Sequence, residues 1–288
     1  METLFPAAST ASTTSTAPDV GYVHGYSTRE AARLGDQADV LAGLLHSGTR
    51  YPDGSRVLEI GCGVGAQTRH LVAHSPGARL VAVDRSAESL AIARARLAEH
   101  APGAFVEWHR ADVHALPFAE GEFDHVFVCF VLEHLADPAG ALERLRRVLR
   151  PGGSLTVIEG DHGSVLFHPD SAPARAAIDC QARLQAAAGG DASLGRRLLP
   201  LLDAAGFTEA RVRPCTVYAD RTREDLRAGF TRDTFVAAIA SVRAEALAAG
   251  LTTPDEWDLG IEELRRTAVG EGTFHYTFFK AVARRPER

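Results

Sequence analysis

Short apolar runs alternate with amphipathic stretches from Ser55 to the end of the chain. The runs are rich in Val, Leu, Ile and Phe and are bounded by Gly, Pro and Asp, which predicts β-strands. Seven strands are expected: RVLEI (56–60), RLVAVD (79–84), FVEWHRAD (105–112), DHVFVCFV (124–131), SLTVIEG (154–160), EARVRPCTVYA (209–219) and TFHYTFFKAVA (273–283). Strands that alternate with helices predict an α/β, Rossmann-like fold with a mostly parallel sheet sandwiched by helices.

Amphipathic helices are expected between these strands, as in SAESLAIARARLAEH (86–100) and DPAGALERLRRVLR (137–150). Apolar residues recur there at helical spacing. The second helix is expected to end at Pro151, which cannot continue a helix, and Gly152 with Gly153 permits a tight turn into the next strand.

Three segments lie outside this alternation. Residues 1–18 are mostly Ser, Thr and Ala, and we expect a disordered tail because they carry little apolar surface to offset the entropy of ordering. Residues 19–50 predict an N-terminal helical lid, and 222–270 predict a helical substrate cap inserted before the last strand of the domain at 51–288. The apolar face of this insertion consists of Phe230, Phe235, Val236, Ile239, Val242 and Leu247.

Composition narrows the classes of function. The formal net charge is −6, and there is no basic stripe of the kind that displaces counterions from nucleic acid. The four cysteines show no CxxC pair, so free thiols in a reducing cytoplasm are expected rather than a zinc site or disulfides. The N-terminal residues resemble neither a secretory signal nor a membrane span, and we therefore expect a cytoplasmic protein without membrane attachment.

A glycine-rich loop follows the first strand in VLEIGCGVGAQT (57–68). Gly61, Gly63 and Gly65 allow a turn with positive φ and let backbone N–H groups approach a ligand closely. GCGVGA also satisfies the dinucleotide fingerprint, with Asp84 at the end of the next strand as the acid that accepts hydrogen bonds from a ribose. The loop and Asp84 thus indicate an adenosine-containing cofactor without distinguishing NAD from others.

The wider set of motifs resembles the class I S-adenosylmethionine-dependent methyltransferases. VLEIGCGVGAQT, VAVDRS, RADVHALPF, FDHVFVCFVLEHLADP and LRPGGSLTVIEGD follow one another in the order and spacing of that family, from Val57 to Glu159. The resemblance implies S-adenosylmethionine as cofactor. An NAD-dependent oxidoreductase and a non-catalytic module that binds the same cofactor are the alternatives.

The resemblance also implies roles for particular residues at the carboxyl ends of the strands, where ligands of open α/β sheets bind. Glu59 would order the glycine loop or face the methionine ammonium, with Gly61 and Gly63 beside the methionine and ribose. The ribose hydroxyls would bind Asp84. The adenine would meet Arg85, Asp112 and Val113, and the methionine part would meet the backbone of Phe130 and, from the lid, Tyr26 and Arg33.

The acceptor is expected to be a hydrophobic small molecule, as in the bacterial natural-product and sterol or quinone-type branch that VLEHLADP and EGDHGSVLFHP resemble. Nucleic-acid enzymes of the fold carry an Asn or Asp before Pro-Pro-aromatic after the fourth strand, where this chain has CFVLEHL. A metal is not expected, although Glu159 and Asp161 are the oxygen ligands that could be considered. An N-terminal arm is well placed to reach a second copy, so a homo-oligomer is also considered.

Methyl transfer is an in-line displacement that depends mainly on alignment. A base is required only when the acceptor must lose a proton. His134, just past the fourth strand, and His162, after the fifth, are the candidate bases because an imidazole titrates near neutral pH. The structural alternatives for both are loop or helix-cap histidines.

Overall fold

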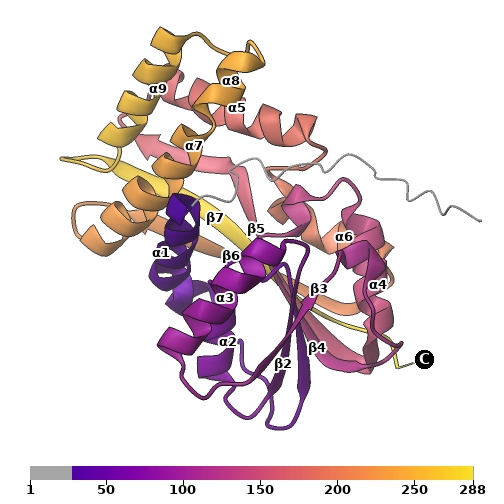
Figure 1. Cartoon of the computed structure of the whole chain (residues 1–288). Coiled ribbons are helices and arrows are strands. Elements are labelled where there is room, and N and C mark those ends of the chain that lie inside the picture. Colours follow the sequence, from indigo (N-terminus) through magenta and orange to yellow (C-terminus); the bar gives the residue numbers. More distant parts are fainter. Residues whose placement is uncertain (1–27, 288) are drawn as a thin grey trace, which may run out of the picture.

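A seven-stranded sheet forms the centre of the protein (Figure 1). The computed structural model describes residues 28–287. The strand order is β3-β2-β1-β4-β5-β7-β6, with β1 to β5 parallel and β7 antiparallel to both neighbours. The strands are β1 (Arg56–Ile60), β2 (Arg79–Asp84), β3 (Val106–Arg110), β4 (Phe123–Cys129), β5 (Leu149–His168), β6 (Thr208–Ala219) and β7 (Thr273–Arg284). The predicted α/β class and the seven strands are confirmed.

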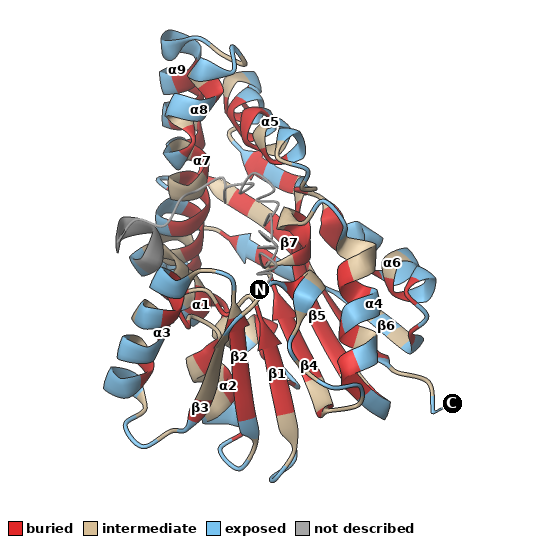
Figure 2. Ribbon diagram, turned by 45° about the vertical axis from the view of Figure 1, so that its right-hand side comes forward, coloured by how far each residue is buried: buried red, intermediate tan, exposed pale blue. Residues whose placement is uncertain are grey.

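Helices cover both faces of the sheet (Figures 1 and 2). One face packs against α1 (Thr28–Leu45), α2 (Thr68–His74) and α3 (Ala87–His100), and the other against α4 (Pro138–Val148) and α6 (Leu198–Ala204). Successive residues of a strand point to opposite faces. Val57 therefore joins the first core and Leu58 the second, which explains why β1 is apolar throughout.

The fifth strand is longer than predicted. We expected it at 154–160, with Asp161 and His162 following it, but β5 runs from Leu149 to His168 and contains both residues. The antiparallel neighbour β7 causes this difference, because its pairing with β5 continues beyond the methyltransferase-like motif, with an irregularity between Asp161 and Leu166. The preceding helix also ends earlier than predicted, at Val148.

A helical layer lies beyond the carboxyl ends of the parallel strands, at the top of Figures 1 and 2. It contains α5 (Ala172–Ala187), α7 (Ala237–Ser241), α8 (Arg243–Ala248), α9 (Pro254–Arg266) and the π-helix η4 (Leu226–Val236). The helices of this layer that follow β6 and precede β7 in the chain fall within residues 222–270, the predicted insertion. No predicted element corresponds to α5, which packs against α9. Short 3-10 turns complete the chain: η1 (Val113–Ala115), η2 (Leu132–His134) and η3 (Leu194–Arg197).

The predicted apolar face of the insertion is largely confirmed. Phe230, Phe235 and Val236 in η4 are buried, as are Ile239 and Val242, whereas Leu247 is half-buried. Among the residues described, no helix is both long enough and apolar enough to cross a membrane. All four cysteines are buried and free.

Lys280 connects the sheet to the end of α1. It is the only lysine in the sequence, and its side chain on β7 is buried. Its Nζ donates to the carbonyl oxygens of Leu45 at 2.8 Å and Ser47 at 3.0 Å, and to the Thr49 hydroxyl. A cation at the carboxyl end of a helix satisfies unpaired carbonyl groups and interacts favourably with the helix dipole. Lys280 thereby holds α1 against the sheet.

We predict that Lys280→Met lowers the free energy of unfolding by about 1–3 kcal/mol, because it leaves the buried Leu45 carbonyl and the buried Thr49 hydroxyl without their donor. Amide hydrogen exchange in the last turns of α1 should become faster. The matched control is Arg213→Met, which removes an exposed donor to the same Ser47 carbonyl and should cost less than about 0.5 kcal/mol. Equal losses from the two variants, measured by chemical denaturation, would contradict the assigned role of Lys280.

Candidate functional site

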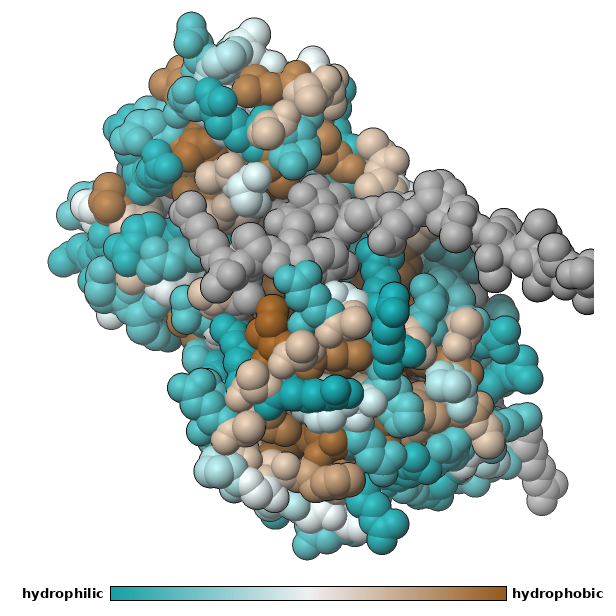
Figure 3. Space-filling view, viewed as in Figure 1, coloured by the Kyte–Doolittle hydropathy of each residue, from teal (hydrophilic) through white to brown (hydrophobic). Residues whose placement is uncertain are grey.

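A cavity of about 290 Å³ lies at the carboxyl ends of the parallel strands. Its walls come from the loops after β1, β2, β3 and β4, from β5 and β7, and from α1, α5 and η4. Figure 3 shows hydrophobic residues in the region between the helical layer and the α/β body. Open α/β sheets bind ligands at this edge, and most of the predicted site residues line the cavity: Arg33, Gly61, Gly63, Asp84, Arg85, Asp112, Val113, Phe130, His134 and His162.

The glycine loop has the conformation that its sequence predicts. Gly61, Gly63 and Gly65 have φ values of 64°, 50° and 75°, in the left-handed region that favours glycine. A Cβ at Gly61 would overlap the Val131 side chain, whereas a Cβ at Gly63 would meet nothing within 4 Å. The bare backbone of Gly63 therefore leaves open space at the cavity wall, which fits the close approach of a nucleoside cofactor.

Glu59 holds the glycine loop from beneath. Its carboxylate accepts a hydrogen bond of 2.7 Å from the hydroxyl of Thr68, the first residue of α2. It is 2% exposed and is not among the residues that line the cavity. Burial, reinforced by the charge of Asp84 and opposed by the Thr68 hydrogen bond, raises the pKa of Glu59 to about 8. The contact corresponds to the predicted loop-ordering role, and binding of the cofactor by Glu59 stays a prediction.

Asp84 links the glycine loop to the end of β2. Its carboxylate accepts hydrogen bonds of 2.8 Å from the backbone N–H of Gly63 and of Ser86. These bonds fix the carboxylate at the cavity wall, and its remaining lone pairs can accept the hydrogen bonds of a ribose.

Asp112 lies across the same part of the cavity. It caps η1 by accepting 2.8 Å from the N–H of His114, so the cap geometry considered as its structural alternative is present at a residue that also lines the cavity. Val113, which follows it, is buried.

Phe130 occupies an unusual backbone conformation directly after β4. Its φ is 57°, which is uncommon for a residue with a side chain and recurs at functional sites. Its N–H donates 2.9 Å to the carbonyl of Ile158 on β5, and its ring lies 5.3 Å from that of Phe278. The strained turn directs the chain from β4 into η2.

Of the two predicted lid residues, the structure describes Arg33 but not Tyr26. Arg33 on α1 lines the cavity and donates 3.0 Å to Gln37, another wall residue. Tyr26 lies outside the described residues, as do the first positions of the predicted lid, 19–27. Cofactor contacts from this segment remain predictions.

The two candidate bases also differ in their surroundings. His162 Nδ1 lies 3.2 Å from the carbonyl oxygen of Ala192 and 3.1 Å from the Tyr276 hydroxyl. Because a carbonyl only accepts, Nδ1 carries the proton and Nε2 is the basic nitrogen. Burial lowers the pKa of His162 to about 4, so this imidazole is neutral at pH 7. His134 Nε2 lies 3.5 Å from the Glu133 carboxylate.

Sequence reasoning missed further polar side chains that line the cavity, among them Glu133, Gln181 and Tyr276. Glu133 stood within the quoted VLEHLADP motif, but only its neighbour His134 was considered. Gln181 on α5 and Tyr276 on β7 carried no motif, because they reach the cavity only through long-range packing.

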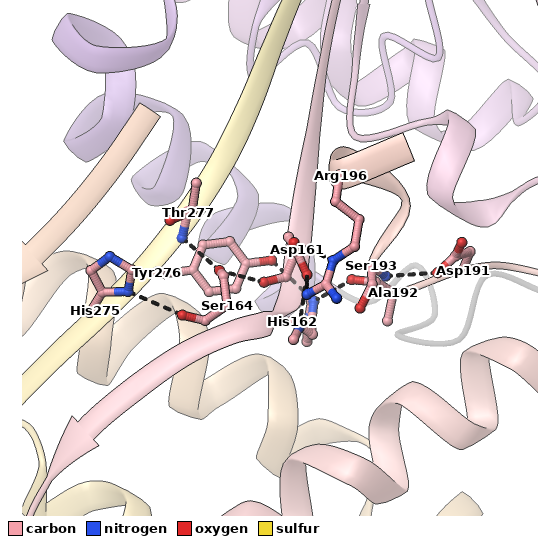
Figure 4. Close-up of polar contacts among 11 residues, drawn as sticks. Asp161, His162, Ser164, Asp191, Ala192, Ser193, Arg196, His275, Tyr276 and Thr277 are labelled. Carbon is pink, nitrogen blue, oxygen red and sulfur yellow. Dashed lines mark hydrogen bonds and ion pairs between the residues drawn. The ribbon is translucent and has the colours of Figure 1, made fainter. Parts of the chain in front are cut away.

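Asp161 and Glu159, considered as oxygen ligands for a metal, both have protein partners. Arg196 donates to both oxygens of Asp161 at 2.7 Å (Figure 4). Glu159 accepts from the N–H groups of Val131, Leu132 and Glu133 at 3.1, 2.8 and 3.3 Å. Within residues 28–287, no cluster of three or more His, Cys, Asp or Glu side chains has a metal-binding arrangement.

Fold and site together define a nucleoside-binding α/β enzyme, and comparison with known proteins specifies the class. Residues 58–157 match the family model described as "Methyltransferase domain". An uncharacterized 37.1 kDa protein of a Streptomyces fradiae transposon is 35% identical over 82% of this chain and 68% of its own length. The ubiquinone/menaquinone biosynthesis C-methyltransferase of Paracoccus denitrificans is 31% identical over 48% of this chain and 59% of its own.

Solved structures agree on the fold. The phosphoethanolamine N-methyltransferase 2 of Haemonchus contortus, in complex with S-adenosyl-L-methionine, superposes with a TM-score of 0.56 at 16% identity, over 89% of this chain and 57% of its own. The chain spans about half the length of the quinone-biosynthesis relatives it matches. The chain belongs to the class I S-adenosylmethionine-dependent methyltransferases, and its cofactor is S-adenosylmethionine.

We predict that Glu59→Gln becomes more stable relative to the wild type as the pH rises. The folded-state pKa of about 8 lies above the ordinary value of 4.5, so the folded protein binds the Glu59 proton more tightly than the unfolded chain. The contribution of Glu59 to stability is therefore present at low pH and is lost as the pH rises through about 8. Glutamine keeps the acceptor for Thr68 and does not titrate.

Thermal denaturation of both proteins at pH 5, 7 and 9 measures this effect. The melting temperature of the variant minus that of the wild type should increase from pH 5 to pH 9. A difference that is constant across this range would mean that Glu59 titrates normally in the folded protein.

Proposed function

We propose that this methyltransferase transfers the methyl group of S-adenosylmethionine to a hydrophobic small-molecule acceptor in natural-product metabolism, without a metal. The observation that carries the proposal is an aromatic wall at the cavity, made by Phe130, Phe230, Phe235, Tyr276 and Phe278. Such a wall binds an apolar molecule through burial of nonpolar surface and through offset or edge-on ring contacts.

The aromatic side chains of the wall form one continuous cluster. The ring centroid of Tyr276 lies 4.7 Å from that of Phe278 and 5.5 Å from that of Phe235. Phe230 lies 5.7 Å from Phe278. Phe230 and Phe235 belong to the π-helix η4, whose wider i to i+5 turns frequently occur at functional sites. In our proposal η4 is the inner surface of the substrate cap at 222–270.

The relatives support a small-molecule acceptor. The quinone-biosynthesis enzymes are named as C-methyltransferases, and the net charge of −6 does not favour nucleic acid. The helix α1 contributes Arg33, Leu34 and Gln37 to the cavity wall, which supports our proposal that 19–50 acts as a lid. A cytoplasmic location and a homo-oligomer formed through the N-terminal arm remain predictions.

Bound S-adenosylmethionine supplies an activated methyl group on a positively charged sulfur. The residues proposed to hold it are the glycine loop, Asp84 for the ribose hydroxyls, and Asp112 with Val113 for the adenine. The aromatic wall, to which Phe130 belongs, lines the same cavity. The protein's contribution is then to orient the acceptor for an in-line displacement and to exclude water from the reacting atoms.

We expect the purified enzyme to convert S-adenosylmethionine to S-adenosylhomocysteine when an apolar acceptor is supplied. A panel of naphthols, indoles and cyclic enols, analysed by mass spectrometry for a mass gain of one methylene, tests this. Oligonucleotides and polar amines should give no product above background. Asp84→Ala serves as the inactive control, since it removes the proposed ribose acceptor. Product formation with oligonucleotides alone would refute a hydrophobic small-molecule acceptor.

The candidate bases give a second prediction. If His134 or His162 is the base, its replacement by alanine should lower kcat with an acceptor from that panel by about tenfold or more and change the Kd for S-adenosylhomocysteine by less than about twofold, because a base acts in the transition state. Calorimetry and steady-state kinetics measure the two quantities. Parallel losses of affinity and rate in both variants would instead indicate structural roles.

A further inference from the structure

The acceptor end of the cavity contains two buried polar atoms that have no partner within the protein. Glu133 is 9% exposed, and its Oε2 makes no hydrogen bond. Gln181 is 1% exposed, and its Oε1 makes none either. Both side chains line the cavity. A buried polar atom without a partner is unfavourable by about 1–3 kcal/mol, so two of them at one wall indicate a ligand that supplies hydrogen-bond donors.

Glu133 and Tyr276 converge on one point of the cavity beside β5. A methyl group at Gly160 would overlap the Tyr276 hydroxyl oxygen and would lie 3.4 Å from Glu133 Oε2. Only a glycine leaves room there for the hydroxyl, and the carboxylate oxygen lies near the same point. Tyr276 also belongs to the aromatic wall. The polar atoms are thus at the edge of the apolar surface proposed to bind the acceptor.

Gln181 is held in position by a relay that leads back to Glu133. Gln181 Nε2 donates 2.9 Å to Gln185 Oε1, and Gln185 Nε2 donates 2.8 Å to the backbone carbonyl of Glu133. Both amide nitrogens are therefore engaged within the protein. The remaining polar atom, Gln181 Oε1, can only accept a hydrogen bond, so the group that binds it must be a donor.

The protonation of Glu133 depends on the groups that face it. These are Glu159 on β5, Asp191 before η3, Tyr276 on β7, and His134, which follows Glu133 in the chain. Asp191 is itself paired with Arg197 at 2.7 Å, and Asp161, on the same strand as Glu159, is paired with Arg196 of η3. Burial raises the pKa of Glu133 to about 7; the backbone N–H of Gly160 opposes this effect and the charge of Asp191 adds to it.

The two buried glutamates, Glu133 and Glu159, differ in the hydrogen-bond donors that reach them. Burial raises the pKa of Glu159 as well, but three backbone N–H donors oppose that effect and stabilise its ionised form. Glu133 Oε2 has no such donor. With its pKa raised to about 7, Glu133 gains and loses its proton close to neutral pH, where a general base is most effective.

We propose that Glu133 is the catalytic base for an acceptor whose hydroxyl group is attached to a flat unsaturated skeleton, a phenol or an enol, and that Gln181 and Tyr276 complete this subsite. The inference rests on the proposed function and deepens it. The flat skeleton is placed by the aromatic wall, and the hydroxyl by the unpartnered oxygen atoms.

The O–H bond of the acceptor breaks and its proton moves to Glu133 Oε2, while the electron pair remains on the acceptor. The acceptor oxygen, or a carbon conjugated to it, forms the bond to the methyl carbon. The carbon–sulfur bond breaks with its electron pair on sulfur, giving S-adenosylhomocysteine. Glu133 then returns the proton to solvent.

Binding of two probes to the full-length protein saturated with S-adenosylhomocysteine tests the subsite. The probes are 1-naphthol and 1-methoxynaphthalene, which share the ring but differ in the donated proton. By calorimetry at pH 8, the wild type should bind the naphthol at least about tenfold more tightly, as expected for a hydrogen bond to a charged acceptor. The preference should fall at pH 6, where Glu133 is protonated.

Glu133→Gln should reduce the preference to about twofold or less and remove its dependence on pH, because an amide does not titrate. Its Kd for S-adenosylhomocysteine should stay within about twofold of the wild-type value, which shows that the variant is folded. The control Glu262→Gln alters an exposed carboxylate on α9 and should behave as the wild type.

The outcomes separate this inference from the proposed function. Equal affinity of the wild type for the two probes, or a tenfold preference retained by Glu133→Gln, overturns the role of Glu133 and leaves a hydrophobic acceptor in place. If S-adenosylhomocysteine binds but neither probe does, both proposals fail.

Discussion

The glycine turn between β1 and α2 is the constraint on which the site depends. Gly61 must pass against Val131 without a side chain, and two carboxylates hold the turn, the buried Glu59 through Thr68 and the half-buried Asp84 through the Gly63 N–H. A chain reversal with positive φ is costly for any other residue type. The loop is therefore both a packing element of the sheet and the wall of the cofactor site, and the two roles cannot be separated.

The strand β7 and the π-helix η4 form the acceptor side of the cavity. The antiparallel strand β7 extends β5 and brings Tyr276 and Phe278 beside the strand ends, while η4 contributes Phe230 and Phe235 from above. Lys280, on the same strand as Tyr276, holds the end of α1. One strand thus connects the helix that lines the cofactor side with the aromatic wall.

Burial of acidic groups is the electrostatic cost of this arrangement. Glu59, Glu133 and Glu159 are all buried near the cavity, where an uncompensated charge is unfavourable. Glu59 and Glu159 each have donors within the protein, whereas Glu133 Oε2 has none. The group left without a partner is the one that faces the acceptor side, which is the reason we assign it a chemical rather than a structural role.

The sequence by itself determined the sheet, the glycine loop and the line of cofactor residues, because each depends on local periodicity or on short motifs. The strand boundaries of β1 and β2 and the positions of Asp84 and Phe130 followed directly from these patterns. Only the tertiary structure decided the length of β5, the separation of Glu59 from the cavity, and the meeting of Glu133, Gln181 and Tyr276. Those three residues are more than 40 positions apart in the chain, and no local pattern marks them. They come together because β7 pairs with β5 and α5 packs over the strand ends, which are long-range contacts that no short stretch of sequence encodes.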